Sequence, residues 1–568
     1  MISLTLVACT DDASDAFPSD RPYANLSDFD NKGCDAASAE SLEGIWHFSL
    51  VGPESEARGS IAVRFAPDPP RQGNLWSDDG GPAAWFSGTQ ANRLVIGNGV
   101  LVRVQFNSLG EHNSWTMFGC HRGDSDRLEG MYAVCGGEQC ETYDAIGYRI
   151  GDLDEPDAVN LDLVSEFSGP ALDPRPKDRV WINVRYRDGY AYVVRRDWLF
   201  VVDVSDPAHP VAVGKTPLTK GNDVKLTVGN DGRLYAITSS DITGLHVIDV
   251  SDPTLPRDRL QFANEFDPVA EEFKGVHTLF IENQRAYITQ DGVKVYDVSQ
   301  PTAPKLLGHY FLGMDMGSGY VHDMFVQDGV VYLNYWGRGL VIVDMKEPAS
   351  PQFLGQFKDY DNRTSHSNWV TRAGGRLVSV HGDESVGAHV RIVDVEPGSP
   401  TFMEAIGRYQ TQEGVSVHNI QAHGELAFVT YYQDGLRVLD ISDPTKPVEV
   451  AHFRTWDGAN SVYGDGIYEG AIGIDYDPQT RLAYVVDTHR GLLILRLGEN
   501  LEPGAAGCSV NSATPGCEWF VLLLLCLGLM VAPRRRGCAQ RSAAATPRVS
   551  ASHQSRTAAD SDRAPRSA

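Results

Sequence analysis

Short apolar segments recur in a fixed order along residues 154–504. Each unit has an apolar segment, a turn, a second segment centred on a bulky residue, a glycine turn, and a third segment that ends in aspartate. None of these segments has the 3.6-residue period of an amphipathic helix, so each is predicted to be a β-strand. The pattern therefore predicts an all-β repeat fold.

The spacing of the units indicates the architecture. The aspartates that end the third segments lie 46 to 50 residues apart, at Asp203, Asp249, Asp297, Asp344, Asp394 and Asp440. A seventh unit keeps its strands but has Arg496 in place of the aspartate. Four short strands in 40 to 50 residues are typical of a propeller blade, which buries both faces by stacking on its neighbours. We therefore predict a seven-bladed β-propeller.

Two positions of the repeat have predicted structural roles. The second segment places a bulky residue at one position of every unit, which predicts packing between blades: Tyr192, Tyr235, Tyr287, Tyr332, Val378, Phe428 and Tyr484. The aspartate and serine of the Asp-x-Ser-Asp-Pro turn are expected to hydrogen-bond to nearby backbone N–H groups. Calcium ligation by these carboxylates is the alternative.

Ring closure needs a fourth strand for unit seven, which supplies three. Residues Val159–Phe167, just before unit one, resemble the outer segments of the other units. We predict that they complete the seventh blade and so join the two ends of the propeller.

The repeats resemble a known bacterial family. Leu340, Val341, Ile342, Val343 and Asp344 spell the consensus of the LVIVD repeat. The resemblance implies a propeller in an exported surface protein, and it implies no catalysis.

A separate domain of about residues 38–151 precedes the propeller. Six or seven apolar segments separated by Gly, Asp and Asn turns predict a small antiparallel β-barrel or β-sandwich. Cys34, Cys120, Cys135 and Cys140 predict up to two disulfides in an exported protein, with three possible pairings. Free buried thiols are the alternative.

The N-terminus resembles a bacterial lipoprotein signal. Residues 1–8 form a truncated, signal-like segment, and Leu6-Val7-Ala8-Cys9 matches the lipoprotein box. The resemblance implies lipid attachment at Cys9, followed by a linker over residues 9–37. The positive residues that normally precede the apolar run are missing, so a simple secretion signal is the alternative.

The C-terminus resembles a MYXO-CTERM sorting tag. A linker at residues 505–518 is followed by an apolar segment at 519–532 and a basic tail at 533–568. The tag-like residues are Gly507, Cys508, Arg534, Arg535 and Arg536. Fourteen apolar residues give about 21 Å of helix, short for a bilayer core of about 30 Å, so a processed span is favoured. The resemblance implies delivery to the cell surface or outer membrane.

The net charge limits the classes of molecule that this chain is expected to bind. The net charge is -26, and the tail from residue 533 contributes eight Arg against two Asp, so the rest carries about -32. Nucleic-acid binding is therefore not expected, because phosphate contacts need clustered cations. Neutral or cationic partners are favoured.

Four histidines are the candidate metal ligands in this sequence. His277, His322, His366 and His418 start the first segment of four consecutive units, which predicts an arc of imidazoles at the mouth of the propeller channel. Such an arc suits a transition metal, with a carboxylate from Asp323 or Glu469 as a further ligand or a base. His366 fits the arc if its turn is two residues longer. The alternative is that each ring hydrogen-bonds to the backbone of a neighbouring blade.

Two functions follow from this sequence. The first is a non-catalytic binding or scaffold module, anchored at the cell surface by lipid or by the C-terminal helix, that takes an envelope or extracellular protein or glycan. The second is a metal-dependent extracellular hydrolase or lyase that uses the histidines. Common nucleotide-binding and hydrolase motifs are absent from the sequence, which favours the first.

Overall fold

The computed structural model describes residues 22–501 except 53–56, 67–82, 87–88, 92, 109–110, 152–156, 170–179, 264, 268–271, 313–319, 361–362, 457–466 and 500. The predicted lipidation site Cys9 and the sorting tag lie outside the described residues. Contacts divide the chain into units 1–508 and 509–568, and every described residue belongs to the first. Among these residues, no helix has the length and apolar character needed to cross a membrane.

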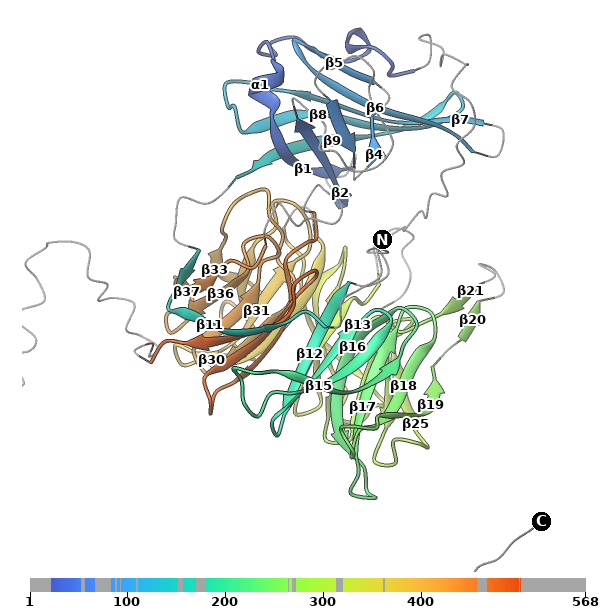
Figure 1. The fold of residues 1–568 in the computed structure, drawn as a ribbon, viewed down its shortest axis with the longest axis vertical. Coiled ribbons are helices and arrows are strands. Elements are labelled where there is room, and N and C mark those ends of the chain that lie inside the picture. The colour runs from blue at the N-terminus through green and yellow to red at the C-terminus, as the bar shows by residue number, and fades with distance from the viewer. Residues whose placement is uncertain are drawn as a thin grey trace, which may run out of the picture. The chain divides into compact units, whose positions relative to one another are not determined.

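The fold is all-β, with a seven-bladed propeller after an N-terminal β domain (Figure 1). The N-terminal domain is one antiparallel sheet in the order β4-β3-β2-β1-β9-β8-β7-β6-β5. It has nine strands, where the sequence predicted six or seven in a barrel or sandwich. Short elements η1 (Leu26–Asp28) and α1 (Ala39–Leu42) precede it. The strands are β1 (Gly44–Val51), β2 (Ala57–Ala66), β3 (Ala83–Phe86), β4 (Thr89–Gln90), β5 (Arg93–Gly97), β6 (Gly99–Ser108), β7 (Glu111–Cys120), β8 (Arg127–Gly136) and β9 (Gln139–Ile150).

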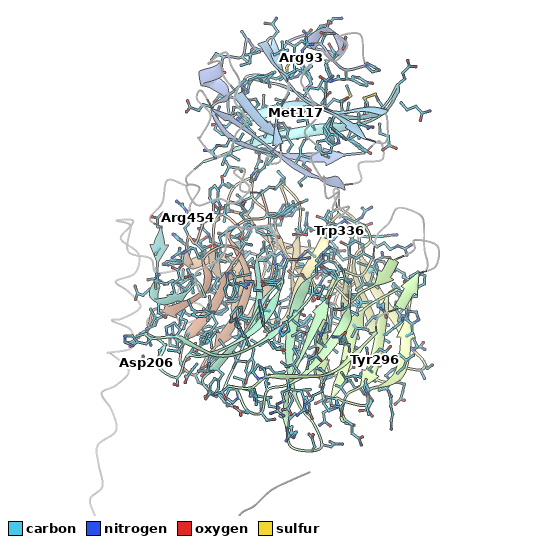
Figure 2. All side chains as sticks on the ribbon, turned by 45° about the vertical axis from the view of Figure 1, so that its right-hand side comes forward. Arg93, Met117, Asp206, Tyr296, Trp336 and Arg454 are labelled. Carbon is cyan, nitrogen blue, oxygen red and sulfur yellow. A yellow bond between two sulfur atoms is a disulfide. The ribbon has the colours of Figure 1, made fainter. Side chains whose placement is uncertain are left out.

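The core of this domain lies along one face of the curved sheet. Trp46, Phe48, Met117 and Leu128 are buried together there, and Met117 is labelled in Figure 2. Two disulfides, Cys34–Cys120 and Cys135–Cys140, confirm the predicted cross-links and resolve the pairing that the sequence left open. The first ties the segment before the sheet to the end of β7, and the second closes the hairpin between β8 and β9.

Seven antiparallel sheets form the propeller. Blades one to three are β12 (Trp181–Arg187), β13 (Tyr190–Arg195), β14 (Trp198–Asp203) and β15 (Val211–Pro217); β16 (Gly221–Val228), β17 (Leu234–Ser240), β18 (Gly244–Asp249) and β19 (Arg257–Phe262); and β22 (Leu279–Glu282), β23 (Arg285–Thr289), β24 (Val293–Asp297) and β25 (Lys305–Tyr310). A separate two-stranded hairpin, β20 (Glu265–Asp267) and β21 (Glu272–Lys274), lies between blades two and three in the chain.

Blades four to seven repeat this order. They are β26 (Asp323–Gln327), β27 (Val330–Tyr335), β28 (Gly339–Asp344) and β29 (Gln352–Phe357); β30 (Ser365–Ala373), β31 (Arg376–Asp383), β32 (Val390–Asp394) and β33 (Ala405–Tyr409); β34 (Ile420–His423), β35 (Leu426–Thr430), β36 (Leu436–Asp440) and β37 (Val448–Phe453); and β38 (Ala471–Asp477), β39 (Leu482–Asp487) and β40 (Gly491–Leu497) with β11 (Leu161–Phe167).

The two repeated positions have the roles that the sequence predicted. All seven bulky residues of the second strands are buried, and none is more than 5% exposed. Each of the six aspartates accepts a hydrogen bond from the backbone N–H two residues further on, at 2.8 to 3.2 Å. The aspartates therefore fix the turn that leads to the outer strand.

Ring closure uses the predicted segment, with one correction. Strand β11 pairs antiparallel with β40, from Leu161 opposite Leu497 to Phe167 opposite Leu492. The short strand β10 (Ala158–Val159), which is separated from β11 by one residue, pairs with β37 and extends blade six instead. The prediction that Val159 belongs to blade seven was therefore wrong. The segment joins two blades, because Asn160 between the two strands has a positive φ that turns the chain.

Ring closure by β11 predicts that alanine substitutions at two of its leucines have very different effects on stability. Leu161 is 2% exposed and packs among buried residues of blades six and seven, whereas Leu163, two residues later, is 41% exposed. We expect Leu161→Ala to lower the free energy of unfolding by about 2–5 kcal/mol, because it leaves a cavity at the closing seam. Leu163→Ala, the matched control, should stay within about 0.5 kcal/mol of the wild type. Equal denaturant midpoints for the two variants would contradict the role of β11.

A candidate metal centre on the inner ring of strands

The first strand of each blade lies at the centre of the propeller. Strands β12, β16, β22, β26, β30, β34 and β38 contact one another in this order, and β38 contacts β12 again. They form a closed inner ring. His322 directly precedes β26, His277 and His418 lie two residues before the first residues of β22 and β34, and His366 is the second residue of β30. All four histidines therefore start strands of the inner ring.

The four imidazoles form a continuous row. The ring centroids of His277 and His322 are 4.3 Å apart, those of His322 and His366 4.2 Å, and those of His366 and His418 4.3 Å. Trp336, which is labelled in Figure 2, lies beside this row with its centroid 5.1 Å from that of His322. The predicted arc of side chains is present in the structure.

Hydrogen bonds distinguish the four rings. The Nδ1 atom of His366 lies 3.2 Å from the carbonyl oxygen of His418, and the Nδ1 atom of His418 lies 2.8 Å from that of Ile472. These two rings thus make the contacts to the next blade that the alternative interpretation expected. His277 instead has its Nδ1 atom 2.8 Å from the carboxylate of Asp241.

Hydroxyl groups fix the backbone of the inner ring. Ser239 donates to the carbonyl oxygen of His277 at 2.7 Å, and Thr278 donates to that of His322 at 2.8 Å. Ser367 donates in the same way to His418, and Thr430 to Ile472 at 3.0 Å. Each donor belongs to the blade before its acceptor, so the bonds set the position of one blade against the next.

A carboxylate that the sequence analysis missed completes the cluster. One ligand atom from each of His322, His366 and Glu384 lies within 4.8 Å of the other two. The distance from His366 Nε2 to Glu384 Oε2 is 3.8 Å, and Tyr432 donates a hydrogen bond of 2.5 Å to Glu384 Oε1. These three side chains, which we call the His-His-Glu cluster, are 2 to 4% exposed.

Three polar atoms of the cluster have no hydrogen-bond partner among the described residues. They are His322 Nδ1, His366 Nε2 and Glu384 Oε2. Most buried side-chain polar atoms in native proteins are hydrogen-bonded, so three such atoms at one point need an explanation.

Burial sets the protonation of the cluster. It lowers the pKa values of His322 and His366 well below the usual 6.5, and neighbouring imidazoles lower them further. Burial also raises the pKa of Glu384 to about 7, although the hydrogen bond from Tyr432 opposes this shift. The two imidazoles are therefore neutral at pH 7, with a lone pair available on one nitrogen each.

The carboxylates proposed from the sequence lie elsewhere. Asp323 accepts a hydrogen bond from the backbone of Met324 at 2.8 Å, and its charge interacts with Lys225 and Asp223. Burial raises the pKa of Asp323 to about 6. Glu469 is fully buried and accepts a hydrogen bond from the Trp456 indole at 3.2 Å. Neither residue belongs to the His-His-Glu cluster.

The sequence did contain a signal for Glu384. This residue directly follows the second strand of blade five. Asp241 and Trp336 directly follow the second strands of blades two and four, and Tyr432 lies two residues after that of blade six. Asp241 contacts His277, and Trp336 and Tyr432 contact His322 and His418. In these four blades the chain just after the second strand thus returns to the histidine row, and comparing the ends of these strands would have pointed to Glu384.

The two extra residues of blade five are not in the turn, where the sequence analysis expected them. The turn between β30 and β31 is Gly374–Gly375, which has the same length as the turn Gly424–Glu425 in blade six. The two extra residues lie in β30, between His366 and Thr371, because Thr371 pairs with Val378 as Gln421 pairs with Phe428 in blade six. His366 is therefore brought into the row by a longer first strand and not by a longer turn.

A comparison with protein families agrees with the repeat architecture. The LVIVD repeat family model matches residues 182–216, 240–260, 318–359 and 414–455, which lie in blades one, two, four and six. No curated protein matches the chain. Among solved structures, a crystal structure of the computationally designed Ika8 protein is 8% identical, with a TM-score of 0.35 over 57% of this chain and 97% of that one. The chain thus carries LVIVD repeats within a seven-bladed β-propeller.

Proposed function

We propose that this chain is an exported, membrane-anchored binding module whose propeller presents a rigid surface to a partner protein. Export is supported by the two disulfides, because such bonds form and persist in oxidising compartments. It is also supported by the sequence resemblances at the two ends, which imply lipid at Cys9 and delivery to the cell surface.

A repeated set of exposed apolar side chains on the outer strands, which we call the outer row, carries this proposal. Each lies among the first three residues of an outer strand, and each is 45 to 57% exposed: Val211, Leu306, Phe353, Leu354 and Val448. They stand on blades one, three, four and six. An apolar group repeated at one place of the fold favours a protein interface, whereas scattered exposed apolar residues need no explanation. The largest group, on blades three and four, is Leu306, Phe353 and Leu354.

The chemistry of these side chains indicates the kind of partner. Four of the five are aliphatic, and aliphatic contacts suit an apolar protein surface better than the hydroxyl groups of a glycan. The acidic body of the chain favours a partner face that is neutral or positively charged. A glycan partner remains an outcome that the experiment distinguishes.

Burial of the His-His-Glu cluster favours binding over catalysis. A catalytic metal needs an open position that its substrate can reach, and the three side chains of this cluster are at most 4% exposed. The hydrolase or lyase interpretation would require the cluster to open toward a substrate. The outer row, in contrast, is already accessible.

If the outer row binds the partner protein, charged substitutions in this row should abolish its capture. In a capture experiment from native cell envelopes, the full-length double variant Leu306→Lys and Phe353→Lys should retain less than a tenth of the partner, because two charges enter an apolar contact. The control Gln352→Lys adds a charge on the same strand and should retain it. Both proteins should keep the wild-type melting temperature, since exposed substitutions change stability by about 0.5 kcal/mol or less.

Undiminished capture by the double variant would contradict the proposed surface. Loss of capture after enzymatic deglycosylation of the envelope fraction, with the double variant unaffected, would identify a glycan instead.

The proposed anchor predicts lipid on the mature N-terminus. When the chain is expressed with a complete signal peptide, mass spectrometry should find acyl groups on Cys9. Cys9→Ser should then move the protein from the membrane fraction to the soluble fraction, because the acyl chains supply the membrane affinity. A mature N-terminus at another residue, without lipid, would contradict this anchor, and a lipidated chain whose Cys9→Ser variant stays membrane-bound would assign retention to the C-terminus.

A further inference from the structure

We propose that His322, His366 and Glu384 bind one divalent first-row transition-metal ion, of which Zn²⁺ is the type case. The ion would lie on the inner ring between blades four and five. This inference does not depend on the proposed partner surface, because the cluster is buried and the outer row is exposed.

The unpartnered atoms are the first reason. Each of the three side chains has one buried polar atom without a hydrogen bond among the described residues, and ligand atoms of the three lie within 4.8 Å of one another. Imidazole nitrogens and a carboxylate oxygen repel one another when all present lone pairs. A cation between them turns this repulsion into three favourable contacts.

The hydrogen bonds around the cluster are the second reason. The carbonyl oxygen of His418 can only accept, so the Nδ1 atom of His366 must carry the hydrogen. The neutral ring then has its lone pair on Nε2, which is the atom 3.8 Å from Glu384 Oε2. Metal-binding histidines usually donate their other N–H in this way, which fixes the tautomer.

Tyr432 plays the same part for the carboxylate. Its hydroxyl donates to Glu384 Oε1, which leaves Oε2 as the free oxygen. The tyrosine comes from blade six, while His322 and His366 come from blades four and five. A bound ion would therefore tie three consecutive blades together at the inner ring.

The donor set indicates the class of ion. Two imidazole nitrogens disfavour Mg²⁺ and Ca²⁺, which take oxygen ligands, and they suit Zn²⁺, Ni²⁺, Cu²⁺ or Fe²⁺. Zinc bonds of about 2.0–2.1 Å place tetrahedral ligands about 3.3 Å apart. The observed 3.8 Å between His366 Nε2 and Glu384 Oε2 is close to this spacing. The fourth position would be left to a water molecule or another small ligand.

His277 and His418 are expected to stay outside the first coordination sphere. The ligand atoms that lie within 4.8 Å of one another come from His322, His366 and Glu384, and neither His277 nor His418 belongs to this set. They flank the cluster at both ends of the row and supply matched controls from the same structural position.

The test is zinc binding by the tag-free, full-length chain after removal of metal with a chelator. We expect one equivalent of Zn²⁺ in equilibrium dialysis and a higher melting temperature with zinc than without it, because the ion binds the folded ring. Glu384→Gln keeps the size and the acceptor for Tyr432 but loses the charge. It should weaken zinc binding at least tenfold and abolish the rise in melting temperature.

Four further variants separate the cluster from the row. His322→Gln and His366→Gln should weaken zinc binding as Glu384→Gln does, whereas His277→Gln and His418→Gln should remain within threefold of the wild type. Absence of stoichiometric zinc in the wild type, or wild-type affinity in folded Glu384→Gln, would overturn the site. Equal losses in all four histidine variants would also overturn it, in favour of a four-histidine arc.

Discussion

Ring closure is the constraint on which the other features depend. Seven sheets can cover one another's faces only if the last blade meets the first, and the chain achieves this when Leu161–Phe167 pairs with β40 from the opposite end of the propeller. The closed inner ring follows, because β38 then contacts β12. His418 shows how the site depends on closure. Its ring bonds to Ile472 in blade seven, so the histidine row is held at this end by the blade that β11 completes.

Within the closed ring, the backbone is repeated and the side chains are not. Hydroxyl-to-carbonyl bonds join blades two to three, three to four, five to six and six to seven, and the ring centroids of consecutive histidines are 4.2 to 4.3 Å apart. The chain just after the second strands of blades two, four, five and six then gives the four histidines different neighbours. An acidic residue stands there in blades two and five, but Asp241 is used by His277 and Arg196, whereas Glu384 keeps one oxygen without a partner among the described residues.

The sequence predicted the parts of this structure that the repeat carries. Blade number, the packing of residues such as Tyr287, the aspartate turns and the row of histidines all follow from a period that can be read by comparing units. Glu384 was missed because its position depends on how far β31 extends, and blade five is longer than its neighbours. The N-terminal sheet has no internal repeat to count, so its shortest strands, β3 and β4, were not separated from the turns around them. Val159 was misplaced because a two-residue strand such as β10 leaves almost no pattern in a sequence.

The inner ring also shows that the fold itself does not require the histidines. In blades one, two and seven, the position that the histidines hold in the other blades is occupied by Ile182, Asn222 and Ile472. Both isoleucines are buried, and the blades that contain them pack as the others do. An apolar side chain is thus sufficient there, and burying an imidazole with an unpaired nitrogen is less favourable than burying isoleucine. His322 and His366 are buried beside the buried carboxylate of Glu384, so packing alone does not account for these two imidazoles.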